Sequence, residues 1–283
     1  MHVNGFCAFA LLLAAGTFSL HAQGTGPMKP PDSSNFPASL PPSKPEAPPI
    51  PPEEIIKRFA AKEDEMNRAI SGYTFQKSVR LEEIGPDGKP TGQVEIVTQE
   101  MLTPDGKLLE KQVRRSTSTI HSMDIERGDP ELLVATPMFP LMTSQLSKYE
   151  ISFGGKQPLD ELSAYYFSVK PRALDRVHAY FSGVVWVDEQ DMVIVKSIGK
   201  WVTEIGDLTS STVPFTIFET QRQQVGKNLW FPSYSRSDET IQAGDTKVPI
   251  RMIVRWTDFT PVAGTPTAGT PSADKPPAAK SAP

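Results

Sequence analysis

The chain has 283 residues, of which 29 are basic and 33 acidic, and its formal net charge is −4. No run of Lys or Arg exceeds two residues, so the strongly basic stripe typical of nucleic-acid binders is absent and no nucleic-acid partner is expected. With a single cysteine, Cys7, the chain cannot close a disulfide on itself, and its stability is expected to come from an ordinary apolar core.

The N-terminus has the pattern of a secretory signal. Residues 6–15 read FCAFALLLAA, and small residues then lead to Ala22. A short apolar run with a cleavage-type small residue predicts a signal peptide over 1–22, whereas spanning a bilayer takes about 20 apolar residues. We therefore expect export to the periplasm or the extracellular space. Cys7 has no small-residue lipoprotein motif before it, so N-terminal lipidation is not expected.

Two low-complexity segments flank a predicted folded body over 53–260. The segment 23–52 holds eleven prolines among the twenty-six positions from residue 27. Proline removes backbone donors and fixes φ, which favours an extended, disordered linker, acting as a spacer or as a docking peptide for a proline-binding partner. The tail over 261–283 is rich in Ala, Pro and Thr, and it is predicted to be disordered because it cannot bury enough apolar surface.

The body is predicted to open with an amphipathic helix and to continue mainly as strands. Between Glu53 and Gly72, apolar residues recur every three or four positions, which indicates a helix that covers a sheet. Gly, Pro and Asp turns then separate alternating segments, which predicts an antiparallel meander. The expected strands are 73–84, 91–102, 107–119, 149–153, 163–170, 214–225, 228–238, 248–259 and a hairpin over 182–201.

One segment interrupts the strands at 129–150. Asp129 is a credible N-cap and is followed by a proline, while Pro137 and Pro140 prevent a continuous helix. We expect two short helical pieces joined by an apolar, methionine-containing kink.

The hairpin over 182–201 is apolar on both faces, since Trp186 alternates with Val185 and Val187. Both of its faces therefore need cover from a sheet, from the kinked segment or from an apolar ligand. Asp188 and Asp191 form the intervening turn and are interpreted as turn formers rather than metal ligands.

Motifs for catalysis or cofactor binding are missing. Beyond the signal, His121 and His178 are the only histidines, and neither has a partner at a metal-ligand spacing. The chain has no nucleophile elbow, phosphate loop or dinucleotide fingerprint. We therefore expect no catalytic residues, no bound metal, no cofactor and no enzymatic activity.

Three stretches carry a resemblance to a known family. Residues 165–171, 180–200 and 226–232 combine an aromatic-rich strand, an acidic turn and a returning Ile/Val strand. Over about 55–259 the chain resembles the outer-membrane lipoprotein-sorting, LolA-like superfamily, which includes periplasmic carriers of lipid-modified proteins and sensors of envelope lipids. The resemblance implies an α+β, mostly antiparallel fold: a curved, half-open barrel sheet packed around an N-terminal helix and the kinked helical segment. No ligand-binding arginine of the family can be placed on this sequence.

The resemblance implies that the chain binds acyl chains of lipids or of lipid-modified proteins in an apolar cavity. The alternative is a non-enzymatic periplasmic interaction or sensor domain of the same fold without bound lipid, which would contact envelope protein partners. Residues 132–142 are expected to cover the cavity mouth, although an ordinary pair of core helices fits the same pattern. The candidate ligand-binding residues are Phe75, Val79, Leu133, Met138, Phe139, Met142, Trp186 and Trp230.

Overall fold

The computed structural model describes residues 47–103, 107–122, 138–175, 178–202, 217–226 and 228–262. The predicted signal peptide, nearly all of the proline-rich linker, the tail from residue 263 and the candidate residue Leu133 lie outside these ranges. None of the helices within them has the length and apolar character to cross a membrane.

The predicted N-terminal helix is confirmed as α1, which spans Pro52–Ile70. A proline in the first turn, with Glu53 and Glu54 beside it, suits a helix start, and Arg68 complements the other end. One side of the helix is buried along its whole length. The buried positions are Ile55, Phe59, Ala60, Glu63, Met66 and Ile70.

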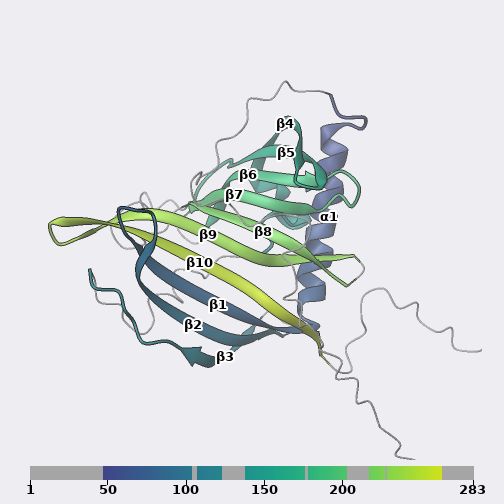
Figure 1. Cartoon of the computed structure of the whole chain (residues 1–283). Coiled ribbons are helices and arrows are strands. Elements are labelled where there is room, and N and C mark those ends of the chain that lie inside the picture. The colour runs from purple at the N-terminus through teal and green to yellow at the C-terminus, as the bar shows by residue number, and fades with distance from the viewer. Residues whose placement is uncertain are drawn as a thin grey trace, which may run out of the picture.

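The described residues form ten strands in a single sheet. They are β1 Tyr73–Ile84, β2 Pro90–Leu102, β3 Leu108–Arg115, β4 Tyr149–Leu159, β5 Leu162–Pro171, β6 Tyr180–Asp188, β7 Ile194–Val202, β8 Phe218–Val225, β9 Leu229–Ala243 and β10 Thr246–Pro261. Their order is β3-β2-β1-β10-β9-β8-β7-β6-β5-β4, and neighbouring strands are antiparallel. The sheet is therefore two meanders joined where β1 pairs with β10 (Figure 1).

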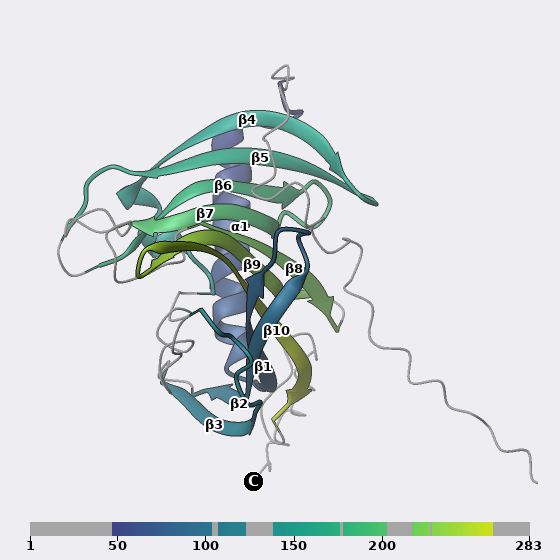
Figure 2. The ribbon, with the colours of Figure 1, turned by 60° about the vertical axis from the view of Figure 1, so that its left-hand side comes forward.

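The sheet curls around α1 without closing, and β3 and β4 are its two edges (Figure 2). This arrangement is the predicted α+β half-open barrel. We call the face toward α1 the inner face and the opposite one the outer face. On the inner face, the ring centroids of Phe59 and Phe167 are 5.7 Å apart, and the last turns of α1 pack on β1, β9 and β10 through Met66 and Ile70.

The hairpin of β6 and β7 is covered on both faces, as its pattern predicts. Val185 and Val187 are fully buried in the cluster that holds Phe59. Trp186 lies on the outer face, where its ring is 6.5 Å from that of Tyr166 and 5.4 Å from Lys196 Nζ.

The turn between β6 and β7 is a hairpin tip held by local hydrogen bonds. The backbone N–H groups of Gln190 and Asp191 donate to Asp188 Oδ2 at 3.0 and 2.7 Å, and Trp230 Nε1–H donates to Asp191 Oδ2 at 3.2 Å. The two aspartates therefore act as turn formers.

The segment 138–148 differs from the two predicted helical pieces. Residues 138–142 are not helical, and Thr143–Lys148 form one short 3-10 helix, η2. Pro140 lies in a turn, and proline has no N–H group to donate to an α-helical ladder. Phe139 and Leu141 are nevertheless buried. Residues 138–142, which we call the cover, therefore pack between α1 and the sheet. The rest of the predicted segment, 129–137, lies outside the described residues.

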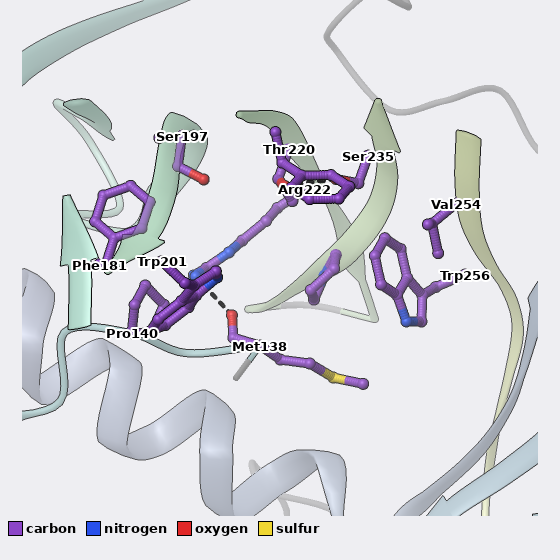
Figure 3. A pocket seen from close by; sticks show the side chains of 13 residues that line it. Met138, Pro140, Phe181, Ser197, Trp201, Thr220, Arg222, Ser235, Val254 and Trp256 are labelled. Atoms are coloured by element: carbon purple, nitrogen blue, oxygen red, sulfur yellow. Dashed lines mark hydrogen bonds between the residues drawn. The ribbon is translucent and has the colours of Figure 1, made fainter. Parts of the chain in front are cut away.

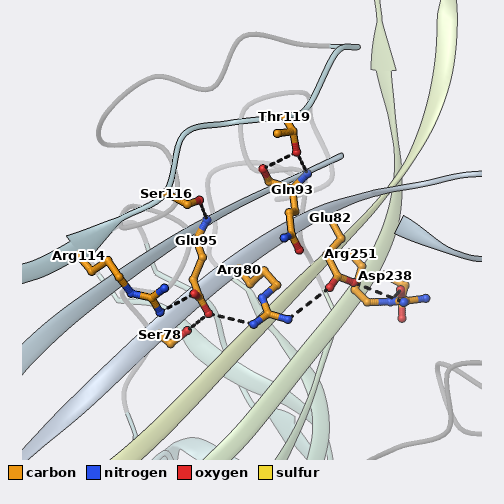
Figure 4. Close-up of polar contacts among 10 residues, drawn as sticks. All are labelled: Ser78, Arg80, Glu82, Gln93, Glu95, Arg114, Ser116, Thr119, Asp238 and Arg251. Carbon is orange, nitrogen blue, oxygen red and sulfur yellow. Dashed lines mark hydrogen bonds and ion pairs between the residues drawn. The ribbon is translucent and has the colours of Figure 1, made fainter. Parts of the chain in front are cut away.

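A ladder of alternating charges crosses the outer face from β3 to β9 (Figure 4). Glu95 accepts from Arg114 at 2.7 Å and from Arg80 at 3.1 Å. Glu82 lies 3.8 Å from Arg80 and 3.6 Å from Arg251, and Arg251 donates in turn to Asp238 at 2.7 Å. The ladder links strands of both meanders across their seam.

This ladder predicts a loss of stability in acid. Burial by itself raises the pKa of Glu95, but hydrogen bonds from Ser78 and Arg80 and the charge of Arg114 outweigh it and hold the pKa below 4.5. Because the pKa is lowered by folding, the stabilisation is present above the unfolded-state pKa and is lost as pH falls through the folded-state value. We expect Glu95→Gln to lower the free energy of unfolding at neutral pH, with a difference from wild type that shrinks in acid. Urea titrations at about pH 7 and about pH 3 measure it.

Glu161→Gln, at an exposed position, is the matched control and should differ little from wild type at either pH. A Glu95→Gln deficit that stays constant across the two pH values would contradict the prediction.

Candidate functional site

The inner face carries a cavity of about 60 Å³ between the sheet and the cover. Met138 and Pro140 of the cover line it, and strands β6 to β10 supply the remaining walls (Figure 3). Most of the walls are apolar. The apolar lining residues are Met138, Pro140, Phe181, Trp201, Phe218, Pro232, Val254 and Trp256.

A row of hydroxyl groups runs across the wall of this cavity. Ser197, Thr220 and Ser235 are register partners on β7, β8 and β9, and the Thr220 and Ser235 hydroxyls are 2.9 Å apart. The indole N–H of Trp256 is buried and has no acceptor within the described part of the chain. The cavity therefore offers uncharged hydrogen-bond donors among apolar walls.

Arg222 on β8 is the cationic residue of the lining, and Glu63 of α1 neutralises it. Both side chains are buried, with exposed fractions of 5% and 1%. The pair is bidentate: Nη1 donates to Glu63 Oε1, and Nη2 donates to Oε2 at 3.0 Å. A two-bond contact of this kind is the strongest geometry for an Arg–carboxylate pair.

Arg222 also holds the cover. Its Nη2 donates to the backbone carbonyl of Met138 at 3.2 Å, and its guanidinium lies 5.2 Å from the ring centroid of Phe139. One side chain thus connects the helix, the sheet and the cover. A second bond, from the Thr143 N–H to Asp64 Oδ1 at 3.2 Å, fastens the end of the cover to α1.

The structure brings only part of the predicted site together. Met138 lines the cavity, and Phe139 packs beneath it against Phe231, with ring centroids 6.5 Å apart. Phe75 and Val79 belong to the inner-face core, and Met142 packs at its margin.

Two predicted tryptophans lie away from the cavity lining. Trp186 is on the outer face, and Trp230 is bonded to the hairpin tip. The cavity instead uses Trp201 and Trp256. The sequence carried a signal for Glu63, which interrupts the apolar stripe of α1 between Phe59 and Met66, but none for Arg222.

The described residues contain no group of three or more His, Cys, Asp or Glu side chains placed to hold a metal ion. Acid–base residues do not converge on the cavity either, since Arg222 is the one ionisable side chain that the described part of the chain contributes to the lining. The chemistry of the cavity is that of apolar walls with a row of uncharged hydroxyl groups.

The architecture is thus a curled antiparallel half-barrel around the long helix α1, with a covered cavity on its inner face. No protein-family model and no curated protein match the chain. Among solved structures, the chain is similar to a DUF1329 family protein from Desulfovibrio piger, at 10% identity over 76% of this chain and 95% of that chain, with a TM-score of 0.36.

It is also similar to an outer membrane lipoprotein-sorting protein domain from Vibrio parahaemolyticus, at 11% identity over 76% of this chain and 94% of that chain, with a TM-score of 0.36. A third similar structure is the MucA/MucB complex of Pseudomonas aeruginosa, at 12% identity over 72% of this chain and 99% of that chain, with a TM-score of 0.21. Lipoprotein-sorting domains are therefore among the structures that the chain is similar to. Similarity at TM-scores this low implies neither a shared ligand nor a shared partner.

Proposed function

We propose that the chain is an exported, non-catalytic protein that binds acyl chains of lipids or of lipid-modified proteins in the inner-face cavity. The observation that carries the proposal is the cavity itself: aromatic walls lie under a cover that two hydrogen bonds and a few apolar side chains hold in place. The apolar run over 6–15 supports export.

The cover has to move for a ligand to enter. A cavity of about 60 Å³ holds roughly two water molecules, and on this proposal it belongs to the closed form. Displacing residues 138–142 removes Phe139 and Leu141 from the interior, where both are buried, and opens the space that they fill. Each methylene of an acyl chain that replaces them in a dry environment contributes about 0.8 kcal/mol.

The ligand and the cover compete for the same apolar walls. When the cover moves away, the ligand takes over its apolar packing against the walls, while the bonds from Arg222 to Met138 and from Thr143 to Asp64 favour closure. A methionine at the mouth suits this exchange, because its flexible thioether repacks around irregular shapes. The donor row of Ser197, Thr220 and Ser235 would face the polar end of the ligand.

Replacing Met138 with serine is expected to weaken acyl binding more than it weakens folding, because Met138 lines the cavity but is only half-buried. On this proposal its side chain closes back over a bound acyl chain, and we expect at least a tenfold rise in Kd, which is about 1.4 kcal/mol. Fluorescence titration with labelled palmitic acid measures binding, and urea unfolding of the same samples measures stability.

The matched control replaces Leu108 and Leu109 with serine, since these exposed side chains lie on the edge strand away from the cavity. It should leave the Kd unchanged. Equal losses of binding and stability in Met138→Ser would contradict the role of the cover, and a wild-type protein that binds no acyl ligand would contradict the proposed function.

A second candidate is an interaction or sensor domain of the same fold without bound lipid. The small cavity volume favours it, because ligand pockets are commonly about 300–1,000 Å³ and the interior here is largely filled by side chains. Native mass spectrometry of the exported protein, purified without detergent and followed by lipid extraction, separates the two. A stoichiometric acyl-containing species supports the carrier; lipid-free protein that takes up no added lipid supports the interaction domain.

A further inference from the structure

The edge strand β3 differs from every other strand in its exposure. Among the described residues it pairs with β2 alone, and seven of its eight residues are exposed. It carries three of the four large apolar side chains that are exposed in the described part of the chain: Leu108, Leu109 and Val113, at 41%, 42% and 57%. Apolar side chains on an unpaired edge mark a site where another strand can add.

The opposite edge, β4, is blunted against such pairing. It contains Pro158, which has no backbone donor, and a register shift between Phe153 and Gly155 that breaks the regular ladder. One of its side chains, Tyr149, is buried and packs on Tyr180. β3 contains neither proline nor glycine, and its own register shift against β2 lies at Val113, after the regular pairing of Leu108 to Gln112. Within the described residues the two edges therefore differ in exposure and in proline content, and β3 is the more open to addition.

The charge on β3 indicates the kind of strand that fits. Arg114 is already paired with Glu95 in the ladder, so the positive charge that β3 offers to a partner comes from Lys111 and from Lys107 just before the strand, in a chain whose net charge is −4. A second copy of β3 that sets Lys111 opposite Lys111 would bring like charge against like charge. An acidic segment would instead complement these lysines.

Leu109 and Lys111 lie two positions apart, so strand alternation places them on one face. A partner strand that meets both presents an apolar residue and an acidic residue at the same spacing. We propose that β3 is a docking edge, onto which an extended segment of another protein with alternating apolar and acidic residues adds as a further strand. Main-chain hydrogen bonds would hold such a segment, and the side-chain pattern would select it. This surface is separate from the cavity and does not depend on acyl binding.

The test uses the full-length exported protein, free of lipid, and two acetylated strand peptides. One alternates valine and glutamate on its recognition face, and the other alternates valine and lysine. NMR amide shifts on titration report both the affinity and the place of binding. We expect the glutamate peptide to shift amides of β3 and the adjoining β2, and to bind more tightly than the lysine peptide.

Lys111→Glu should lower the affinity for the glutamate peptide by up to about fivefold, as expected for one cross-strand charge pair. The same substitution should raise the affinity for the lysine peptide. Lys89→Glu, at a turn where the side chain is 80% exposed, is the matched control and should change neither affinity. The proposal is overturned if neither peptide shifts β3, if both bind equally, or if Lys111→Glu leaves the preference unchanged. It is also overturned if sedimentation equilibrium shows a wild-type dimer that Val113→Asp dissociates, because β3 would then be occupied by a second copy.

Discussion

Replacing Glu63 with glutamine is expected to lower the free energy of unfolding by about 3–5 kcal/mol, because it removes one partner of a buried ion pair. Arg222 would keep its charge at a site where its side chain is 5% exposed, without the carboxylate that compensates it. The same guanidinium donates to Met138, so its displacement would also loosen the cover of the cavity. Urea unfolding followed by tryptophan fluorescence measures the loss.

Two further variants test whether the loss comes from the unpaired buried charge. Replacing both partners, Glu63→Leu with Arg222→Met, leaves no unpaired charge and should recover most of the stability lost in the single variant. Glu54→Gln breaks the exposed pair with Arg58 and should cost less than about 1 kcal/mol. A Glu63→Gln variant as stable as Glu54→Gln would show that the buried pair does not hold the helix to the sheet.

Phe59→Ala is the other substitution with a large expected effect, a loss of about 3–5 kcal/mol from a fully packed aromatic. Phe59 is completely buried and lies between the N-terminal half of α1 and β5, with its ring 5.7 Å from Phe167. Its removal leaves a cavity between two elements that each bury a single face. Thermal and urea unfolding both report the change.

Phe59→Leu, which keeps most of the volume, should cost clearly less than Phe59→Ala and serves as its control. Arg58→Ala, one position earlier on the exposed face of α1, should stay within about 0.5 kcal/mol of wild type. A Phe59→Ala loss below about 1 kcal/mol would mean that the helix is not docked as described.

The local elements were readable from the sequence because each depends on short-range periodicity. The three- and four-residue spacing of Ile55, Phe59, Met66 and Ile70 predicts α1 closely. The two apolar faces of the β6–β7 hairpin predict cover on both sides, which the structure shows. The segment after Pro137 was harder to predict, because its apolar residues fit a helix equally well, whereas the backbone forms a turn at Pro140.

The cavity could be predicted only in outline, because its walls come from five strands that register brings together. Met138 follows from its apolar, proline-broken segment, but Trp201 and Trp256 are ordinary strand aromatics until β7 and β10 are placed. Arg222 and Glu63 are 159 residues apart, and no local pattern joins them. Trp186 was a candidate because it is large and apolar, and alternation alone does not say which face of the sheet meets the helix.

The pairing of β1 with β10 has a consequence for how the chain is made. These strands begin at Tyr73 and Thr246, so the N-terminal meander cannot join the rest of the sheet until the last strand has left the ribosome. Contacts that span most of a chain form late, since the entropy of closing a long loop is lost before they stabilise anything. Within the described residues the joining strand is also the last one, so the sheet stays incomplete until synthesis is nearly over. Such a delay suits the export proposed above, in which the chain crosses a membrane before it folds.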